Sequence, residues 1–186
     1  AILGLADDQV VALCQQASAG ATGSVEAANY NSQGQVVIAG TTALVQAVMA
    51  EAKAQNGKAI ALPVSVPSHC SLMKPAAEQF AQALEQTAIE LPRIPVIQNV
   101  NAQAATDVAA VRQALTAQLY QSVQWTKTMQ YLQDQGIGYI VECGPGTVLS
   151  NLAKRLPNIE KTFAIDSKSR IEDALSAVLV AEGKIA

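Results

Sequence analysis

The sequence predicts an α/β protein in which a ferredoxin-like subdomain is joined to a parallel-sheet core. In residues 1–66 the predicted strands and helices follow the order β-α-β-β-α-β, which is the arrangement of a split βαβ unit. In residues 67–186 helices alternate with short strands, a pattern typical of parallel sheets with right-handed crossovers. Half of the 186 residues are hydrophobic, so the chain is long and apolar enough to bury a core.

The first strand and helix are predicted from hydrophobic spacing. Residues 1–5 are mostly apolar and favour a strand. Asp7 or Asp8 can cap the helix that follows, whose apolar face includes Val10 and Leu13. This pair supplies the first β-α step of the subdomain.

A hairpin, a second helix and a last strand complete the subdomain. Strands at 25–30 and 35–39 flank Asn31-Ser32-Gln33-Gly34, whose residue types favour a tight turn. A helix with an apolar stripe then runs to Asn56-Gly57, where a left-handed residue can end it. The branched and apolar run at 59–66 is the fourth predicted strand.

The remainder of the chain alternates between helices and strands. Helices are expected at about 72–88, 107–120, 123–133, 147–156 and 171–180, and strands at 95–99, 139–142 and 161–165. Three strands make a poor parallel sheet by themselves, because such sheets need cover on both faces and at their edges. We therefore expect further strands in residues that precede Ala1.

Composition narrows the class of partner and the compartment. The net charge is −3 and 15% of the residues are charged, which gives no electrostatic reason to expect nucleic acid or a membrane as partner. Cys14, Cys70 and Cys143 form no C-x-x-C pair, which argues against a disulfide framework. No apolar run reaches the roughly 18 residues needed to cross a bilayer, and the first residues do not resemble a signal peptide. We expect a cytoplasmic protein.

His69 is the only histidine in the chain, and it lies where a predicted strand meets a predicted helix. Loops at the carboxyl ends of strands hold reacting groups in many α/β enzymes, because they face a crevice above a rigid sheet. A side chain that titrates near neutral pH is a candidate acid–base catalyst at such a turn. The alternative is a hydrogen-bonded structural histidine. No cluster of His, Cys, Asp or Glu has the spacing of metal ligands.

Several blocks of sequence carry a resemblance to a known family. They are YNSQGQVVIAG at 30–40, VPSHCSLMKPAAEQF at 66–80, PVIQNV at 95–100, AQLYQSVQWTK at 117–127 and VECGPGTVLSNLAKR at 141–155. In this order they resemble the malonyl-CoA:acyl-carrier-protein transacylases of fatty acid synthesis. The resemblance implies an α/β-hydrolase-like parallel core, the acyltransferase fold. Residues 1–66 would be its inserted ferredoxin-like subdomain, and residues 67–186 the C-terminal part of the core.

The resemblance also implies a reaction. A malonyl group would pass from coenzyme A to the phosphopantetheine thiol of acyl carrier protein in a ping-pong transfer, by way of a serine ester. His69 would take the proton of that serine, and the backbone carbonyl of Gln118 would orient the imidazole in place of an acidic residue. Coenzyme A would enter as a thioester substrate, and no tightly bound cofactor is expected.

The nucleophile itself is missing from the sequence. A serine of this kind sits on a G-x-S-x-G turn, and no such motif occurs in the 186 residues. Ser24, Ser68 and Ser150 lack the flanking glycines. The resemblance assigns the serine, the oxyanion amides and the arginine for the malonyl carboxylate to an N-terminal half that precedes Ala1. This segment alone is therefore predicted to be inactive.

Five further residues are candidates for substrate binding. By the resemblance, Ser68 would line the acyl pocket, and Asn31 and Gln35 would contact the thioester arm or pantetheine. Asn99 ends a predicted strand on the same sheet edge as His69 and could line the same crevice, and Lys58 could meet phosphates of coenzyme A or an acidic patch of the carrier protein. On the residues alone, the serine can cap a helix, the amides can be turn residues and the lysine can simply be solvated.

Two features near the end of the last block have weaker signals. Gly144-Pro145-Gly146 fits neither phosphate-binding glycine motif, and we expect a tight turn there. Lys154-Arg155 is a second basic candidate, either for coenzyme A phosphates or for an acidic patch of the carrier protein.

Two other functions fit parts of the sequence. The chain could belong to the acyltransferase domain of a polyketide or fatty acid synthase with a different acyl preference. Alternatively, residues 1–66 could act as a non-catalytic ferredoxin-like binding module, with His69 incidental. The length of chain after Val66 speaks against the second interpretation, because a regulatory module does not need so much further α/β sequence.

Overall fold

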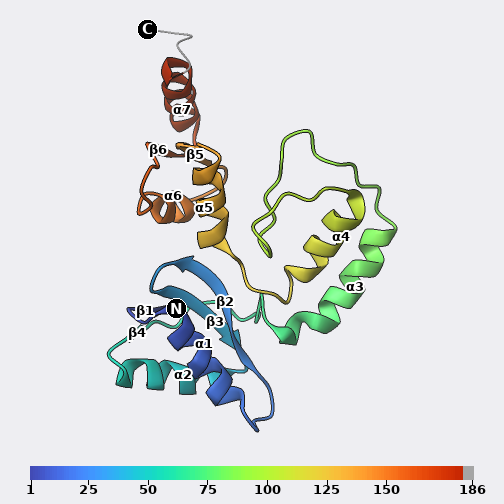
Figure 1. Ribbon diagram of the computed structural model, residues 1–186, viewed down its shortest axis with the longest axis vertical. Helices are drawn as coiled ribbons and strands as arrows, with labels where there is room; N and C mark the ends of the chain where they lie inside the picture. The colour runs from blue at the N-terminus through green and yellow to red at the C-terminus, as the bar shows by residue number, and fades with distance from the viewer. Residues whose placement is uncertain (182–186) are drawn as a thin grey trace. The chain divides into compact units, whose positions relative to one another are not determined.

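The structure is a computed structural model that describes residues 1–181 (Figure 1). The chain forms two compact units, one of residues 1–128 and one that begins at Met129. The predicted α/β class is confirmed, since helices and sheets occur in both units. Among the described residues, no helix combines the length and the apolar character needed to span a bilayer.

The first unit opens with a four-stranded antiparallel sheet in the strand order β2-β3-β1-β4. This order, with helices between β1 and β2 and between β3 and β4, is that of a ferredoxin-like subdomain and confirms the prediction. The elements are β1 (Ile2–Leu3), α1 (Asp7–Ser18), β2 (Val25–Ser32), β3 (Gln35–Gly40), α2 (Thr42–Ala54) and β4 (Lys58–Ala59).

A single apolar core holds the subdomain together. Helices α1 and α2 pack against each other and against the sheet (Figure 1), so that Val10 of α1, Val36 of β3 and Val48 of α2 are all buried in one cluster. Alternate residues of β2 and β3 point into this cluster because side chains alternate between the faces of a strand. The predicted hairpin is also confirmed, with Gly34 at φ +70° in its turn.

The fourth strand is shorter than predicted. It ends at Ala59, and residues 60–66 are irregular, with Leu62 and Val64 45% and 67% exposed. The prediction of a strand over 59–66 was therefore wrong. Its neighbour β1 has two residues, and beyond Ala59 the pairing continues only to Ile60, whose N–H donates to the carbonyl of Ala1 at 2.8 Å and whose carbonyl accepts from the amino group of Ala1 at 2.7 Å. Residues 61–66 have no ladder partner within the described residues. An apolar run without a partner strand does not form a strand.

The N-terminal cap of α1 differs from the prediction, and that of α4 is made by a side chain. Asp7 and Asp8 lie in the first turn of α1 and do not cap it; the cap is Ala6, whose N–H donates to the side chain of Gln9 at 2.9 Å. Asp107 caps α4 (Val108–Ala117), since its carboxylate accepts from the N–H of Ala110 at 2.7 Å.

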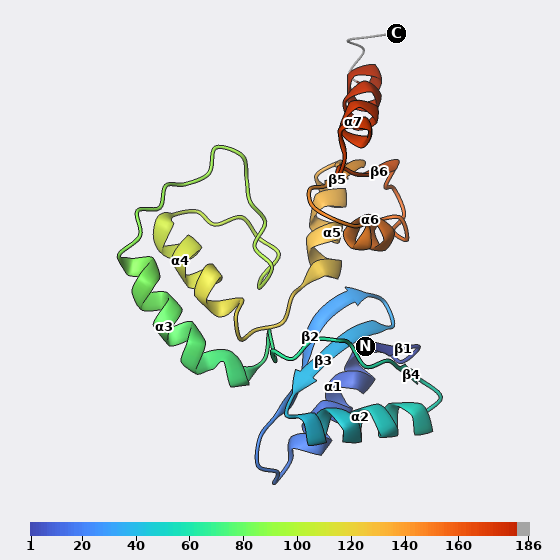
Figure 2. The same ribbon diagram turned by 180° about the vertical axis from the view of Figure 1, so that it is seen from behind.

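The regular elements in the rest of the first unit are helices. The 3-10 turn η1 (Ser71–Met73) leads into α3 (Lys74–Glu85), which packs against α4, and α5 (Trp125–Asp134) begins before the unit ends. Figure 2 shows the long irregular stretch that joins α3 to α4. The predicted strand at 95–99 was wrong, because this stretch holds a single bridge between Ile97 and Ala104 rather than a ladder.

Whereas the sequence predicted three strands in residues 67–186, the second unit contains a parallel sheet of two strands. These are β5 (Tyr139–Glu142) and β6 (Lys161–Ala164), accompanied by α6 (Val148–Ala153) and α7 (Lys168–Ala181). The parallel direction is confirmed, and the third predicted strand is the irregular stretch of the first unit. Val148 and Leu149 of α6 are 69% and 41% exposed, so this unit leaves apolar surface open.

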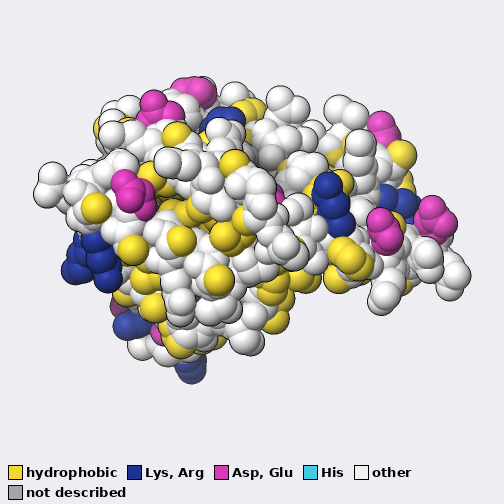
Figure 3. Space-filling view, turned by 90° about the horizontal axis from the view of Figure 1, so that it is seen from below, with side chains coloured by type: hydrophobic (Ala, Val, Ile, Leu, Met, Phe, Trp, Pro, Cys, Tyr) yellow, Lys and Arg dark blue, Asp and Glu magenta, His cyan; other side chains and the backbone are white. Residues whose placement is uncertain are grey.

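Figure 3 shows one face of the molecule, on which apolar side chains reach the surface in many places. Basic and acidic side chains are both present on this face and are spread among other groups. This distribution agrees with the low charge content of the sequence and offers no broad field of one sign on the face shown.

Candidate active site

His69 lies on a strained turn that two backbone carbonyls hold. Its φ is +64°, a left-handed conformation that a residue with a Cβ adopts at a cost of order 1 kcal/mol or more. Its N–H donates to the carbonyl of Leu119 at 2.9 Å, and its ring Nδ1 lies 2.5 Å from the carbonyl oxygen of Gln118. The side chain is half-buried. The turn is therefore fixed by contacts to a segment that lies 49 residues further along the chain.

The contact with Gln118 fixes which ring nitrogen can act as a base. A carbonyl oxygen only accepts hydrogen bonds, so Nδ1 carries the proton and Nε2 keeps a lone pair. Gln118 is also the C-terminal cap of α4. The last carbonyls of a helix lack intrahelical partners, so the Gln118 carbonyl can accept from the imidazole.

Residues 118–124, here called the connecting segment, tie the turn to the subdomain. Ser122 donates from Oγ to the carbonyl of Ala27 at 2.6 Å, and the Val123 N–H donates to the carbonyl of Ala28 at 2.8 Å. The N–H of Tyr30 in turn donates to the carbonyl of Val123 at 3.0 Å. The connecting segment therefore lies along β2 while its first two carbonyls contact His69.

A second set of contacts on the turn was not predicted. The carboxylate of Glu26, on β2, accepts from both the N–H and the hydroxyl of Ser71, two residues after His69. The hydroxyl of Ser24 lies 3.0 Å from that of Ser71. No sequence motif signals this contact, because the two residues are 45 positions apart and Glu26 lies outside the blocks that carry the resemblance.

Cys70, next to His69, is fully buried. Its Sγ donates to the carbonyl of Pro67 at 3.1 Å. Burial raises the pKa of this thiol, with a smaller contribution from the charge of Glu26. Since the thiolate is the reactive form, burial and the raised pKa both disfavour a nucleophilic role for this thiol.

Ser68 directly precedes His69 in the chain, and Asn99 contacts the connecting segment. Ser68 is half-buried, and it caps no helix, since the caps of η1 and α3 are Cys70 and Met73; its interpretation as a cap was wrong. Asn99 does not end a strand as predicted, but its carbonyl accepts from the N–H of Gln124 at 2.8 Å. Asn99 therefore adjoins the segment that holds the histidine, whereas Ser68 adjoins the histidine through the chain.

The other candidate residues lie in the four-stranded sheet. Gln35 and Lys58 pair with opposite sides of Leu3, and Asn31 is near the end of β2 in the hairpin. Lys58 is exposed, and the two amide residues are half-buried. Asn31 follows Tyr30, whose backbone pairs with the connecting segment.

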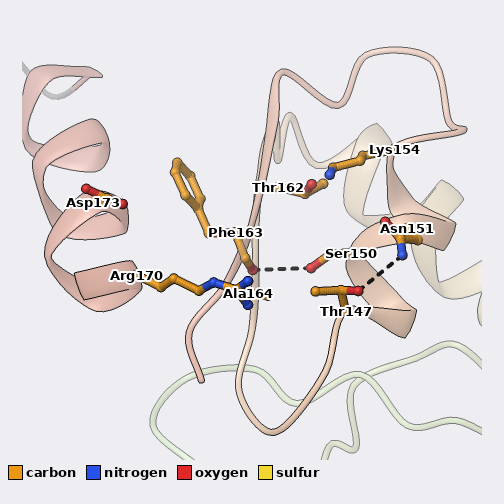
Figure 4. Close-up of a pocket in the computed structure, with 9 residues that line it drawn as sticks. All are labelled: Thr147, Ser150, Asn151, Lys154, Thr162, Phe163, Ala164, Arg170 and Asp173. Atoms are coloured by element: carbon orange, nitrogen blue, oxygen red, sulfur yellow. Dashed lines mark hydrogen bonds between the residues drawn. The ribbon is translucent and has the colours of Figure 1, made fainter. Parts of the chain in front are cut away.

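The second unit has a cavity of about 270 Å³, drawn in Figure 4. Ser150 donates to the carbonyl of Phe163 at 3.3 Å, and Asn151 donates to Thr147 at 3.2 Å. Lys154 also lines it, together with Arg170, whose guanidinium pairs with Asp166 at 2.9 Å. Ser150, Asn151 and Arg170 thus bond to other residues of the same unit. The residues that line the cavity include no histidine or cysteine.

The turn before α6 is structural, as expected from the sequence. Gly144 and Gly146 have φ of +138° and +91°, values that glycine adopts without strain. Glu142 accepts from the N–H groups of Ser150 and Leu149 at 2.9 and 3.0 Å, and these bonds, that of Ser150 foremost, lower the pKa of the carboxyl. Among the described residues, no group of three or more His, Cys, Asp or Glu could hold a metal ion.

The fold is that of an acyltransferase domain. Residues 4–176 match the family profile described as the acyl transferase domain, and the chain belongs to this family. The match runs through both the subdomain and the segments beyond it, which counts against a stand-alone binding module.

Within this family, the chain is similar to several malonyl-transacylases. The crystal structure of FabD from Acinetobacter baumannii is 84% identical with a TM-score of 0.95, over 97% of this chain and 57% of that one. The malonyl CoA-acyl carrier protein transacylase of Salmonella typhimurium is 42% identical over 95% of this chain and 57% of its own length. A structure of a malonyl-transacylase in complex with a type II polyketide acyl-carrier protein is 39% identical, with a TM-score of 0.90, over 95% of this chain and 57% of that one. The chain therefore spans little more than half the length of the relatives it matches.

Proposed function

We propose that the protein to which this chain belongs transfers a malonyl group from coenzyme A to the phosphopantetheine thiol of acyl carrier protein. The transfer proceeds through a serine ester, with His69 as general base. The observation that carries the proposal is the 2.5 Å contact between Nδ1 of His69 and the carbonyl of Gln118, which leaves Nε2 able to accept a proton. The names of the relatives supply the substrate and the carrier.

The two half-reactions use the same imidazole. In the first, Nε2 takes the serine proton as the hydroxyl oxygen attacks the malonyl thioester carbon, and the imidazolium returns the proton to the departing coenzyme A thiolate. In the second, Nε2 takes the proton of the carrier thiol, whose sulfur attacks the serine ester, and the proton passes back to the serine oxygen. The Gln118 carbonyl keeps the tautomer fixed, although it stabilises imidazolium less than a carboxylate does.

The serine and the groups that stabilise the oxyanion come from sequence outside these 186 residues, in an N-terminal half of the same enzyme. We assign residues 1–66 to the inserted subdomain and residues 67–186 to the C-terminal part of the core. The exposed apolar side chains of each unit, such as Val64 at 67% and Val148 at 69%, support a partner surface of this kind.

Substrate contacts are assigned on the same basis. Ser68 and Asn99 adjoin the acyl group, Asn31 and Gln35 adjoin the pantetheine arm, and Lys58 adjoins the coenzyme A phosphates. Coenzyme A is bound only as the thioester substrate, no further cofactor takes part, and the enzyme acts in the cytoplasm.

Labelling with malonyl-CoA tests this function. We expect the complete protein to gain one malonyl group on a serine within its first turnover, measured by intact mass and peptide mapping. The 186-residue chain alone should gain none. A complete protein that remains unlabelled, or is labelled on cysteine, contradicts the proposal.

The carrier can be tested separately. The match to a transacylase that serves a type II polyketide carrier makes such a carrier a second candidate acceptor. Once the serine is labelled, adding a fatty acid carrier or a polyketide carrier in its phosphopantetheine form, and comparing the rates at which label leaves the serine, identifies the acceptor.

A further inference from the structure

The turn that carries His69 is attached to strand β2 at two places. On one side, the Glu26 carboxylate accepts from the Ser71 N–H at 3.1 Å and from the Ser71 hydroxyl. On the other, His69 contacts the connecting segment, whose Val123 pairs with Ala28 of the same strand. These contacts close a ring that starts and ends on β2.

This ring holds a backbone that would otherwise relax. A left-handed φ at a residue with a side chain persists only where surrounding contacts fix it. The connecting segment fixes the histidine itself, but the chain on its far side is held through Ser71. A carboxylate is suited to this task, because hydrogen bonds to a charged acceptor are roughly twice as strong as neutral ones.

We infer that Glu26 is a positioning residue for His69, acting through Ser71 to keep the imidazole against the Gln118 carbonyl. Its kinetic consequence rests on the proposed function, but its effect on the ring does not. Ser24 supports the same contact from its place beside the Ser71 hydroxyl. Glu26 touches no reacting atom in this account.

Two mechanisms by which Glu26 could act are separable. If it acts by hydrogen bonding, Glu26→Gln keeps an oxygen acceptor for Ser71 and preserves most of the effect, whereas Glu26→Ala removes it. If it acts by its charge, the two variants behave alike. Ser71→Ala keeps the charge and the backbone bond but loses the hydroxyl bond, so an intermediate effect is expected. Glu51→Ala, on the exposed face of α2, is the control.

The effect of these contacts on the imidazole of His69 can be observed by NMR in the complete protein, labelled with ¹⁵N-histidine. The His69 signal is identified by its loss in His69→Gln. We expect one fixed tautomer in the parent, in Glu26→Gln and in Glu51→Ala, and a shift of both ring nitrogens toward the tautomer average in Glu26→Ala. If the ¹⁵N chemical shifts of the two imidazole nitrogens are unchanged in both Glu26→Ala and Ser71→Ala, the inference is overturned. Should Glu26→Ala not fold, Ser71→Ala alone decides it.

Kinetics give the second measurement. Glu26→Ala should lower kcat on the order of tenfold with KM for malonyl-CoA unchanged, since a small displacement of a catalytic group costs rate rather than binding. Glu26→Gln should recover most of the rate, and a Glu26→Gln as slow as Glu26→Ala contradicts positioning by hydrogen bonding. If His69→Ala is fully active while Glu26→Ala still moves the ring signals, the proposed function fails but the positioning role stands.

Discussion

The ferredoxin-like subdomain buries its apolar side chains more completely than the second unit does. In the subdomain, four antiparallel strands and two helices bury Val10, Val36 and Val48 completely or nearly so. In the second unit, two parallel strands leave Val148 and Leu175 69% and 57% exposed. Antiparallel strands joined by a hairpin complete their own ladder, whereas parallel strands need neighbours supplied from elsewhere in the chain.

The chain spans little more than half of its relatives' length. The difference in strand pairing explains why the subdomain buries its apolar side chains while the second unit leaves several exposed. The histidine turn belongs to the first unit and is anchored on the finished sheet. The comparison can be sharpened by experiments that measure packing in each region separately.

The largest expected difference lies in thiol reactivity. Burial, followed by the charge of Glu26, raises the pKa of Cys14 to about 11, and this side chain is buried in the subdomain, whereas Cys143 in the second unit is exposed. In native protein at about pH 8, we expect a disulfide reagent to modify Cys143 at least about a hundredfold faster than Cys14. In denaturant the rates should converge. Equal native rates would show that the subdomain is not closed.

Core truncation should give the next largest effect. Leu13→Ala, at a position 6% exposed in the subdomain core, should lower the free energy of unfolding by about 2–4 kcal/mol. The matched change Leu175→Ala, at 57% exposure in the second unit, should lie within about 0.5 kcal/mol of the parent. Both are measured by urea unfolding followed by circular dichroism, and similar losses for the two variants would remove the contrast.

A helix cap within the first unit gives a smaller effect. Asp107→Ala should cost about 1 kcal/mol of unfolding free energy, because it removes the acceptor for the Ala110 N–H. Thr41→Ala is the control, since the Thr41 hydroxyl at the start of α2 has no hydrogen-bond partner. A loss at Thr41 as large as that at Asp107 would contradict this assignment of the caps.

The smallest expected effect concerns the pH dependence of the second unit. Backbone hydrogen bonds, that of Ser150 foremost, lower the pKa of Glu142 in the folded state. The ionised carboxylate therefore stabilises the fold above its ordinary pKa, and this contribution is lost as the pH falls through the lowered folded value. Glu142→Gln should show a smaller fall in Tm between about pH 7 and about pH 3 than the parent. An equal fall would indicate that the hydrogen bonds from Leu149 and Ser150 to Glu142 do not stabilise the fold.

The sequence predicted those elements whose signal is local. The turn at Asn31-Ser32-Gln33-Gly34 predicted the hairpin, and alternating order predicted the ferredoxin-like subdomain, because both depend on neighbouring residues. The strands at 59–66 and 95–99 were wrong, since an apolar run becomes a strand only where another strand can pair with it. Their composition could not reveal that the described chain lacks those partners.

The candidate site was predictable to a similar degree. His69 stood out as the only histidine, whereas Gln118 was found through family resemblance, because a backbone carbonyl leaves no trace in residue type. Glu26 could not be found at all, since it meets Ser71 through the sheet rather than through any motif. A side-chain variant at Gln118 should accordingly change activity little, as the contact is made by main chain.

The most direct test of the central claim is the pre-steady-state rate of serine malonylation in the complete enzyme, measured by rapid quench for the parent and for His69→Ala. Loss of a nucleophile's base should slow this step by several orders of magnitude while the protein stays folded. A variant that is acylated at nearly the parent's rate would show that His69 is not the base.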